Sequence, residues 1–247
     1  MNLTLITMSQ GNPTALRRTL DSFGPHCSQI IYGDLLLFEE DRKVITSWLA
    51  ELPLIVVPFK FNYIFEHGFS ALLNVLAAAA KTSRVVYMNC GEVIDTKFAQ
   101  HFELLEEDYN CWFFRHETEP HKWIRTYVPQ ELKWGGLIHE ETEGARRVCP
   151  TELFYMADTP KDSNDPTKAK ICEDVKELCY FQQLETLRQH PEHLGATSAG
   201  WLNYVQQQGT HYADRLAAKG WRYQAFLNGS LEDYLDAARK DFAWTTP

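Results

Sequence analysis

Short apolar stretches alternate with amphipathic stretches over the first 106 residues. The apolar ones are rich in β-branched residues and have the length of buried strands; they cover residues 2–8, 29–32, 54–58 and 84–88. The amphipathic ones have the pattern or composition of helices and cover residues 14–23, 39–52, 69–81 and 94–106. This alternation predicts an α/β fold: a twisted, mostly parallel sheet with helices on both faces.

The remaining chain divides into two regions. Strands are expected over residues 110–115 and 122–128, whereas residues 158–168 are polar and contain proline, which predicts a loop or a mobile lid. Helices are then expected over residues 171–189, 196–208, 210–219 and 231–240. We therefore expect a core over residues 1–155 and a helical C-terminal region over 156–247. Locally, Thr14 is the expected cap of the first helix, and residues 62–68 are expected to form a loop.

Composition and charge narrow the class of protein. The 247 residues suffice for one large domain, and 45% of them are hydrophobic. A formal net charge of −9 argues against a dominant basic groove for nucleic acid. The six cysteines form no C-x-x-C pair, which favours free thiols in a reducing compartment. The sequence shows no secretory signal and no transmembrane segment, so we expect a cytoplasmic protein.

Polar residues follow three of the predicted parallel strands. They are Ser9, Gln10 and Asn12 after the first, Asp34 after the second, and Asn89, Gly91 and Glu92 after the fourth. Ligand sites in open parallel sheets lie outside the carboxyl ends of the strands. These residues are therefore the first candidates for a binding site, although each is equally suited to forming a turn.

Four segments, in this order, resemble family 2 glycosyltransferases of the GT-A fold. They are Leu3–Met8 with the L-x-x-T-L-x-S helix Leu16–Phe23, then Ile30–Asp34, then Gly68–Asn74 followed by Val85–Glu92, and finally Trp134–Glu140 with its G-x-I-H-E ending. The resemblance covers roughly residues 2–145. It implies an enzyme that transfers a hexosyl or pentosyl group from a nucleotide-diphosphate sugar, with a UDP-sugar favoured, to an acceptor hydroxyl.

The strand-end positions and the resemblance together give the candidates for donor binding. The donor-binding candidates are Ser9, Gln10, Asn12, Asp34, Asn74, Asn89, Gly91 and Arg125. Asp34 corresponds to the strand-end aspartate that contacts the base or ribose, and the Arg125 guanidinium suits a diphosphate. The helical region after residue 155 then either binds the acceptor or packs on the core.

One departure from the family concerns the metal. The family has a D-x-D motif whose two carboxylates hold Mg²⁺ or Mn²⁺ on the donor diphosphate, but this chain has Asn89 and Gly91 at those positions. Glu92 and His139 are the remaining candidate ligands. Three interpretations stay open: the metal is held differently, the diphosphate is neutralised by other means, or activity is lost.

The chemistry needs a base for the acceptor hydroxyl. The resemblance points to Glu140, with Glu141 as the near alternative and His139 beside them as a metal or diphosphate contact. Without the resemblance, residues 140–143 would be read as an exposed acidic turn. Inversion at the anomeric carbon is expected by analogy with the family.

Other functions remain as alternatives. The acceptor can be a glycan, a lipid-linked sugar, a peptide or a small molecule; a hydroxymethylated base in DNA is conceivable but not favoured by the acidic charge. A non-catalytic nucleotide-sugar-binding protein on the same fold is the main alternative, because the D-x-D carboxylates are missing. A nucleotidyltransferase ranks last, because residues 9–13 lack the Gly-rich basic loop it would need.

Overall fold

The computed structural model describes residues 3–94, 108–116, 122–136, 141–149, 154–158, 165–194 and 199–242. The chain forms two compact units. The first comprises Met1–Pro58, Leu73–Lys133 and Thr142–Asp162, and the second comprises Phe59–Leu72, Trp134–Glu141 and Ser163–Pro247. The boundary expected near residue 155 stays a prediction.

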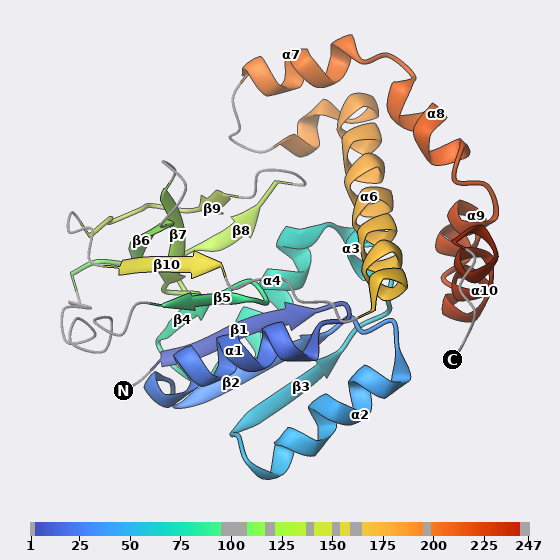
Figure 1. Ribbon diagram of the computed structural model, residues 1–247. Helices are drawn as coiled ribbons and strands as arrows, with labels where there is room; N and C mark the ends of the chain where they lie inside the picture. Colours follow the sequence, from blue (N-terminus) through green and yellow to red (C-terminus); the bar gives the residue numbers. More distant parts are fainter. Residues whose placement is uncertain are drawn as a thin grey trace. The chain divides into compact units, whose positions relative to one another are not determined.

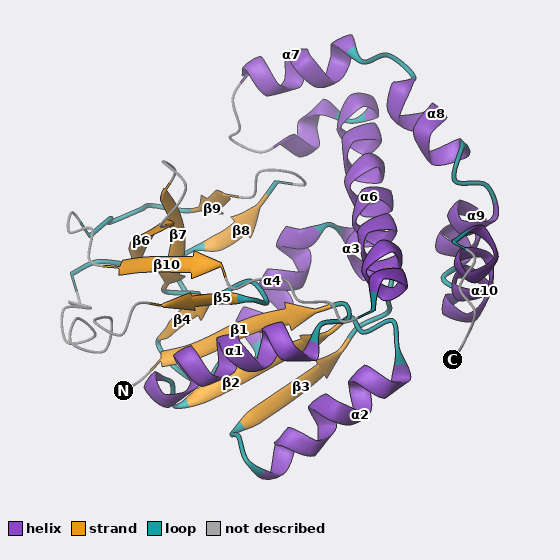
Figure 2. Ribbon diagram, in the orientation of Figure 1, coloured by secondary structure: helices purple, strands orange, loops and turns teal. Residues whose placement is uncertain are grey.

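An eight-stranded sheet forms the centre of the first unit, as far as the described residues define it (Figures 1 and 2). Its strands are β1 (Leu3–Ser9), β2 (Gln29–Asp34), β3 (Leu54–Pro58), β4 (Arg84–Tyr87), β5 (Glu92–Ile94), β6 (Cys111–His116), β7 (Lys122–Tyr127) and β10 (Phe154–Asp158). They lie in the order β3-β2-β1-β4-β7-β6-β10-β5. Strands β3, β2, β1 and β4 are parallel, β7 is antiparallel to β4 and β6, and β10 is parallel to β6 and antiparallel to β5. The predicted mostly parallel sheet is confirmed.

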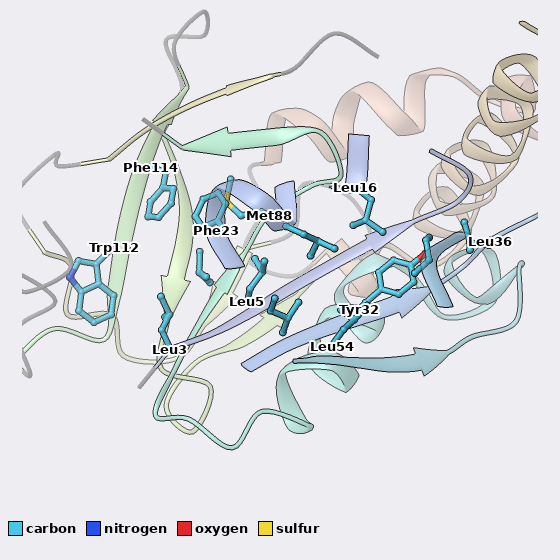
Figure 3. Close-up of a cluster of buried hydrophobic side chains, with 14 of the residues drawn as sticks. Leu3, Leu5, Leu16, Phe23, Tyr32, Leu36, Leu54, Met88, Trp112 and Phe114 are labelled. Carbon is cyan, nitrogen blue, oxygen red and sulfur yellow. The ribbon is translucent and has the colours of Figure 1, made fainter. Parts of the chain in front are cut away.

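Helices cover both faces of this sheet. Helices α1 (Pro13–Phe23) and α2 (Glu39–Ser47) lie on one face, and α4 (Phe69–Ala78) reaches the other (Figure 1). The first face packs because α1 has a buried stripe at helical spacing, formed by Leu16, Leu20 and Phe23. This stripe meets alternate side chains of the strands, among them Leu3, Leu5 and Tyr32 (Figure 3).

The cap of helix α1 lies two residues before the expected cap, Thr14. The side chain of Asn12 caps it by accepting the backbone N–H of Ala15 at 2.9 Å. Pro13 then occupies the first turn, where a fixed φ and a missing N–H cost nothing. Asparagine followed by proline is a better start signal than an exposed threonine.

Hydroxyl groups of α1 also fasten the segment that follows β4. The Thr19 hydroxyl, fully buried, accepts the backbone N–H of Gly91 and donates to the backbone oxygen of Glu92, both at 2.9 Å. One turn further along, the Ser22 hydroxyl accepts the backbone N–H of Ile94 at 3.0 Å. These are the threonine and serine of the L-x-x-T-L-x-S segment, so that segment holds the turn between β4 and β5.

The second unit is mainly helical. Its helices are α3 (Tyr63–His67), α6 (Pro166–Gln189), the 3₁₀ turn Pro191–Leu194, α7 (Ala199–Gln207), α8 (His211–Ala217), α9 (Trp221–Asn228) and α10 (Leu231–Asp241). The helical C-terminal region is thus confirmed. Strands β8 (Lys133–Gly135) and β9 (Glu141–Glu143) pair in a separate two-stranded sheet.

Several local expectations were wrong or incomplete. Residues 62–68 contain α3 instead of a loop, because Phe65 is an apolar anchor that packs on Phe226. Asp165 caps α6, which therefore starts inside the expected polar loop. Helix α9 and strands β5, β8, β9 and β10 were not expected. Of the helix expected over 94–106, Ile94 lies in β5 and residues 95–106 lie outside the described residues.

The second unit is held by an aromatic cluster above a buried carboxylate. Phe61, Phe65, Phe226 and Tyr234 pack with ring centroids 4.9–5.9 Å apart in their recorded pairs. The Tyr234 hydroxyl donates to the carboxylate of Asp174 at 3.0 Å. Lys219 lies 2.8 Å from the same carboxylate and Arg222 lies 3.3 Å from it, so one acidic residue of α6 holds α9, α10 and the turn that precedes α9.

All six cysteines are free thiols. Burial raises the pKa of Cys27 and of Cys179 to about 12, so both thiols stay protonated at neutral pH. Among the described residues, no helix is both long enough and apolar enough to cross a membrane.

The first prediction concerns Asp174. Replacing Asp174 with Asn leaves two cationic side chains without their buried counter-charge, so the free energy of unfolding should fall by about 3 kcal/mol. Urea denaturation measures this. The matched control is Glu177→Gln, which removes the other carboxylate partner of Lys219 but at an exposed position, and it should cost less than about 1 kcal/mol. Equal effects of the two variants would refute the assignment.

The second prediction concerns Thr19. A Thr19→Val substitution keeps the shape of the side chain but leaves the N–H of Gly91 and the carbonyl of Glu92 without this partner. It should lower the free energy of unfolding by about 1–3 kcal/mol in thermal or urea denaturation. Thr46→Val is the control, since the Thr46 hydroxyl bonds an exposed helix carbonyl, and it should change stability by less than about 0.5 kcal/mol. A Thr19 variant as stable as the control would contradict the tether.

Candidate functional site

Three segments converge at the carboxyl ends of parallel strands in the first unit. Ser9 lies opposite Asp34 in the β1–β2 register, and the backbone N–H of Leu35 donates to the Ser9 carbonyl at 3.2 Å. The Cys90 thiol lies 3.6 Å from the Asn12 carbonyl, which connects the first loop to the turn after β4. The structure therefore brings together the segments 9–12, 34–37 and 89–92, as the strand-end rule predicts.

The loop after β1 is shaped by its own side chains. The Ser9 hydroxyl accepts the backbone N–H groups of Gly11 at 3.3 Å and of Asn12 at 3.2 Å. Asn12 uses its side-chain oxygen to cap α1. Gln10 is half-buried between them, and its carbonyl accepts the N–H of Leu37 at 3.2 Å. Ser9 and Asn12 thus fix the loop, and donor contact by these three residues stays a prediction.

Asp34 is neutralised by an arginine that the sequence reasoning did not identify. Its buried carboxylate accepts from Arg42 Nε at 2.8 Å and from the backbone N–H of Leu36 at 2.9 Å. The hydrogen bond to Asp34 raises the pKa of the Arg42 guanidinium above its ordinary value, so Arg42 stays charged. The same guanidinium donates to the Leu36 carbonyl at 3.1 Å, so the pair closes the loop after β2.

The turn after β4 places an amide above a buried ion pair. Asn89 is exposed, and its side chain is hydrogen-bonded to the Tyr87 hydroxyl. Below it, one carboxylate oxygen of Glu92 accepts from Asn89 Nδ2 at 2.8 Å and from Arg125 at 2.6 Å. The other oxygen accepts the backbone N–H of Asn89 at 2.6 Å. Both oxygens of Glu92 are therefore engaged within the protein.

Arg125 reaches this turn from β7. The β4–β7 register pairs Val86 with Thr126, so Arg125 is the next residue toward the carboxyl end of β4. Its guanidinium lies 4.9 Å from the centre of the Tyr87 ring. The side chains of Arg125 and Glu92 are only 7% and 6% exposed, so the ion pair is shielded from solvent. Arg125 was a candidate from the sequence, but its pairing with Glu92 was not foreseen.

The described residues do not fit a D-x-D-type metal site. Asn89 offers a neutral amide that already binds Glu92 and Tyr87, and Gly91 has no side chain. Glu92 is paired with a cation. Within the described parts of the chain, no three His, Cys, Asp or Glu side chains gather where they could hold a metal ion. The predicted ligand His139 lies outside the described residues, so the Glu92–His139 metal site stays a prediction.

Asn74, Glu140 and Glu141 complete the set of candidates. Asn74 is half-buried in α4, and its donor contact stays a prediction. Glu140 also lies outside the described residues, and Glu141 is the first residue of β9. In the second unit, the Ser70 hydroxyl lies 2.7 Å from the Gly136 carbonyl and 3.0 Å from the Gly135 carbonyl. These hydrogen bonds link the Gly68–Asn74 segment to the two glycines, Gly135 and Gly136, that precede His139 and Glu140 in the sequence.

Comparisons with known proteins give a structural likeness only. No protein-family model matches the sequence, and no curated protein matches it. Among solved structures, the crystal structure of S. aureus TarS 1–349 aligns with a TM-score of 0.47 at 9% identity, covering 100% of this chain and 93% of that one. The same protein in complex with UDP-GlcNAc aligns with a TM-score of 0.48 at 8% identity, covering 98% and 92%.

Proposed function

We propose that this protein is a glycosyltransferase that binds a nucleotide-diphosphate sugar at the carboxyl ends of β1, β2 and β4. The observation that supports the proposal is the convergence of the segments 9–12, 34–37 and 89–92 in the first unit. Two of these segments are parts of the sequence resemblance to family 2 glycosyltransferases. The resemblance and the strand-end geometry are separate arguments, and both select Asp34 and residues 89–92.

Each part of the site has a role in the proposal. The loop Ser9–Asn12 and the Asp34–Arg42 pair form the side that receives the nucleotide, where backbone groups and a charged guanidinium suit a base and ribose. Asn89 projects from the turn after β4 and faces the diphosphate. The turn itself is held by Thr19 and Glu92, so the Asn89 side chain is fixed in position before the ligand binds.

The transfer step needs a base near the acceptor hydroxyl. In the proposal Glu140 takes the proton as the hydroxyl oxygen attacks the anomeric carbon, and the bond to the diphosphate breaks with inversion. Glu141 is the alternative base, and His139 stands beside them. The acceptor class stays open among a glycan, a lipid-linked sugar, a peptide, a small molecule and, less favoured, a modified base in DNA.

A non-catalytic nucleotide-sugar-binding protein is the second candidate. The observation that favours it is the replacement of both D-x-D carboxylates by Asn89 and Gly91, in a turn where Glu92 is committed to Arg125. Both candidates predict donor binding, and only the first predicts transfer or slow hydrolysis of the donor.

Donor binding is the third prediction. In a thermal-shift screen against UDP-, GDP-, ADP- and CMP-sugars, one base class should stabilise the protein. At a ligand concentration about 100 times the dissociation constant, the expected rise in Tm is about 5–10 °C. An Asn89→Ala variant should bind the same donor roughly tenfold more weakly by calorimetry, because a hydrogen-bond donor to the diphosphate is lost. Asn203→Ala, on an exposed face of α7, is the control and should bind like the wild type. Absence of a shift with every donor would overturn the proposal.

The fourth prediction tests the base. Glu140→Gln should reduce donor turnover by about 100-fold or more while leaving donor affinity unchanged, because only the proton acceptor is removed. The rate of donor hydrolysis or transfer, monitored through the nucleotide released, measures this effect. Glu143→Gln, at an exposed position of β9, is the control and should keep full turnover. If Glu141→Gln is the inactive variant instead, the base is Glu141; if neither loses turnover, the assignment fails.

A further inference from the structure

We propose that the donor site works without a divalent cation, and that Glu92 is a positioning residue for Asn89 instead of a metal ligand. The inference rests on the proposed function and concerns how that site meets the donor diphosphate. It starts from the chemistry of the turn between β4 and β5, where the family resemblance places a metal and this chain places an arginine-bound glutamate.

The first argument is the occupancy of the carboxylate. A metal ligand must offer an oxygen lone pair directed toward an open position. One oxygen of Glu92 accepts from Arg125 and Asn89, and the other accepts the backbone N–H of Asn89 at 2.6 Å. Three hydrogen bonds thus use three of the roughly four lone-pair sites of the carboxylate. A cation at Glu92 would have to take the last site or displace one of these bonds. In either case it would lie near the Arg125 guanidinium, a positive charge in a shielded environment, which opposes metal binding.

The second argument is the backbone at position 91. Gly91 has φ of 98°, a conformation that residues with a side chain rarely adopt. Its N–H is held by Thr19 in this conformation. An aspartate at this position would therefore be strained, so the turn does not suit a carboxylate ligand at position 91.

The third argument is that Glu92, paired with Arg125, holds the side chain of Asn89 in place. The carboxylate of Glu92 holds Asn89 at two points, through the backbone N–H and through Nδ2, and the Tyr87 hydroxyl holds the side-chain oxygen. The amide nitrogen of an asparagine carries two hydrogens, and one of them points to Glu92. We assign the other to a diphosphate oxygen of the donor. Glu92 acts through Asn89, and Arg125 keeps Glu92 in place.

The test compares donor affinity with and without metal. Isothermal titration calorimetry of the intact protein with the donor found in the screen is carried out in excess EDTA, in MgCl₂ and in MnCl₂. The three dissociation constants should agree within about twofold. A donor that binds at least about tenfold more tightly with either metal overturns the inference but leaves the proposed function standing. A protein that binds no donor under any of the three conditions overturns both.

Two variants separate positioning from ligation. Glu92→Gln keeps an acceptor for Arg125 but presents an amide N–H toward the backbone N–H of Asn89, and Glu92→Ala removes every contact. Donor affinity should fall modestly in Glu92→Gln and by about tenfold in Glu92→Ala, by the same factor in EDTA and in metal. A metal ligand would behave differently, because its loss would weaken binding in metal and leave binding in EDTA unchanged. That pattern would overturn the inference, and the wild-type comparison decides the question even if both variants fold poorly.

Discussion

The buried ion pair between Glu92 and Arg125 is the interaction on which the candidate site depends. It joins the turn after β4 to β7, two segments that are distant in the sequence. Removing charges from water is costly, and a buried ion pair is weak evidence for net stability. Its value here is geometric. Arg125 donates to one oxygen of Glu92, and Glu92 holds Asn89 through both of its oxygens. Thr19 of α1 holds the rest of the turn, so the exposed Asn89 is supported by buried, hydrogen-bonded groups.

The second unit uses the same device for a different purpose. Asp174 is a single buried carboxylate that meets Lys219, Arg222 and Tyr234, and these residues come from the segments around α8, α9 and α10. The described contacts of Asp174 lead to no candidate ligand-binding residue. Its partner Tyr234 packs instead against the aromatic rings of Phe61 and Phe226. The comparison shows why a buried charge is not by itself a functional signal. Glu92 differs because it is hydrogen-bonded to an exposed asparagine, Asn89, in a turn that lies beside two other strand-end loops.

The sequence predicted the sheet well because its signals are local. Four β-branched runs and the turns after them gave β1 to β4, and the strand-end rule then grouped residues 9–12, 34 and 89–92 correctly. Elements without a local signal were missed. Strand β5 has three residues, β10 pairs with partners far away in the chain, and α3 exists because Phe65 packs on a helix some 160 residues later. The arginine partners of Asp34 and Glu92 were missed for the same reason, since pairing depends on tertiary register and not on spacing.

The absence of aspartate at positions 89 and 91 and the presence of Arg125 beside Glu92 are related through the charge of the turn. In a D-x-D site, two carboxylates and one divalent cation sum to zero, and the cation is what allows a diphosphate to approach carboxylates at all. In this chain Glu92 and Arg125 also sum to zero, and so do Asp34 and Arg42. Asn89 and Gly91 add no charge. The turn is therefore neutral, as the proposed ion-free donor site requires, and an aspartate introduced at position 89 or 91 would add a negative charge to it. In the proposed site, the absence of D-x-D carboxylates and the pairing of Glu92 with Arg125 are two parts of one charge balance.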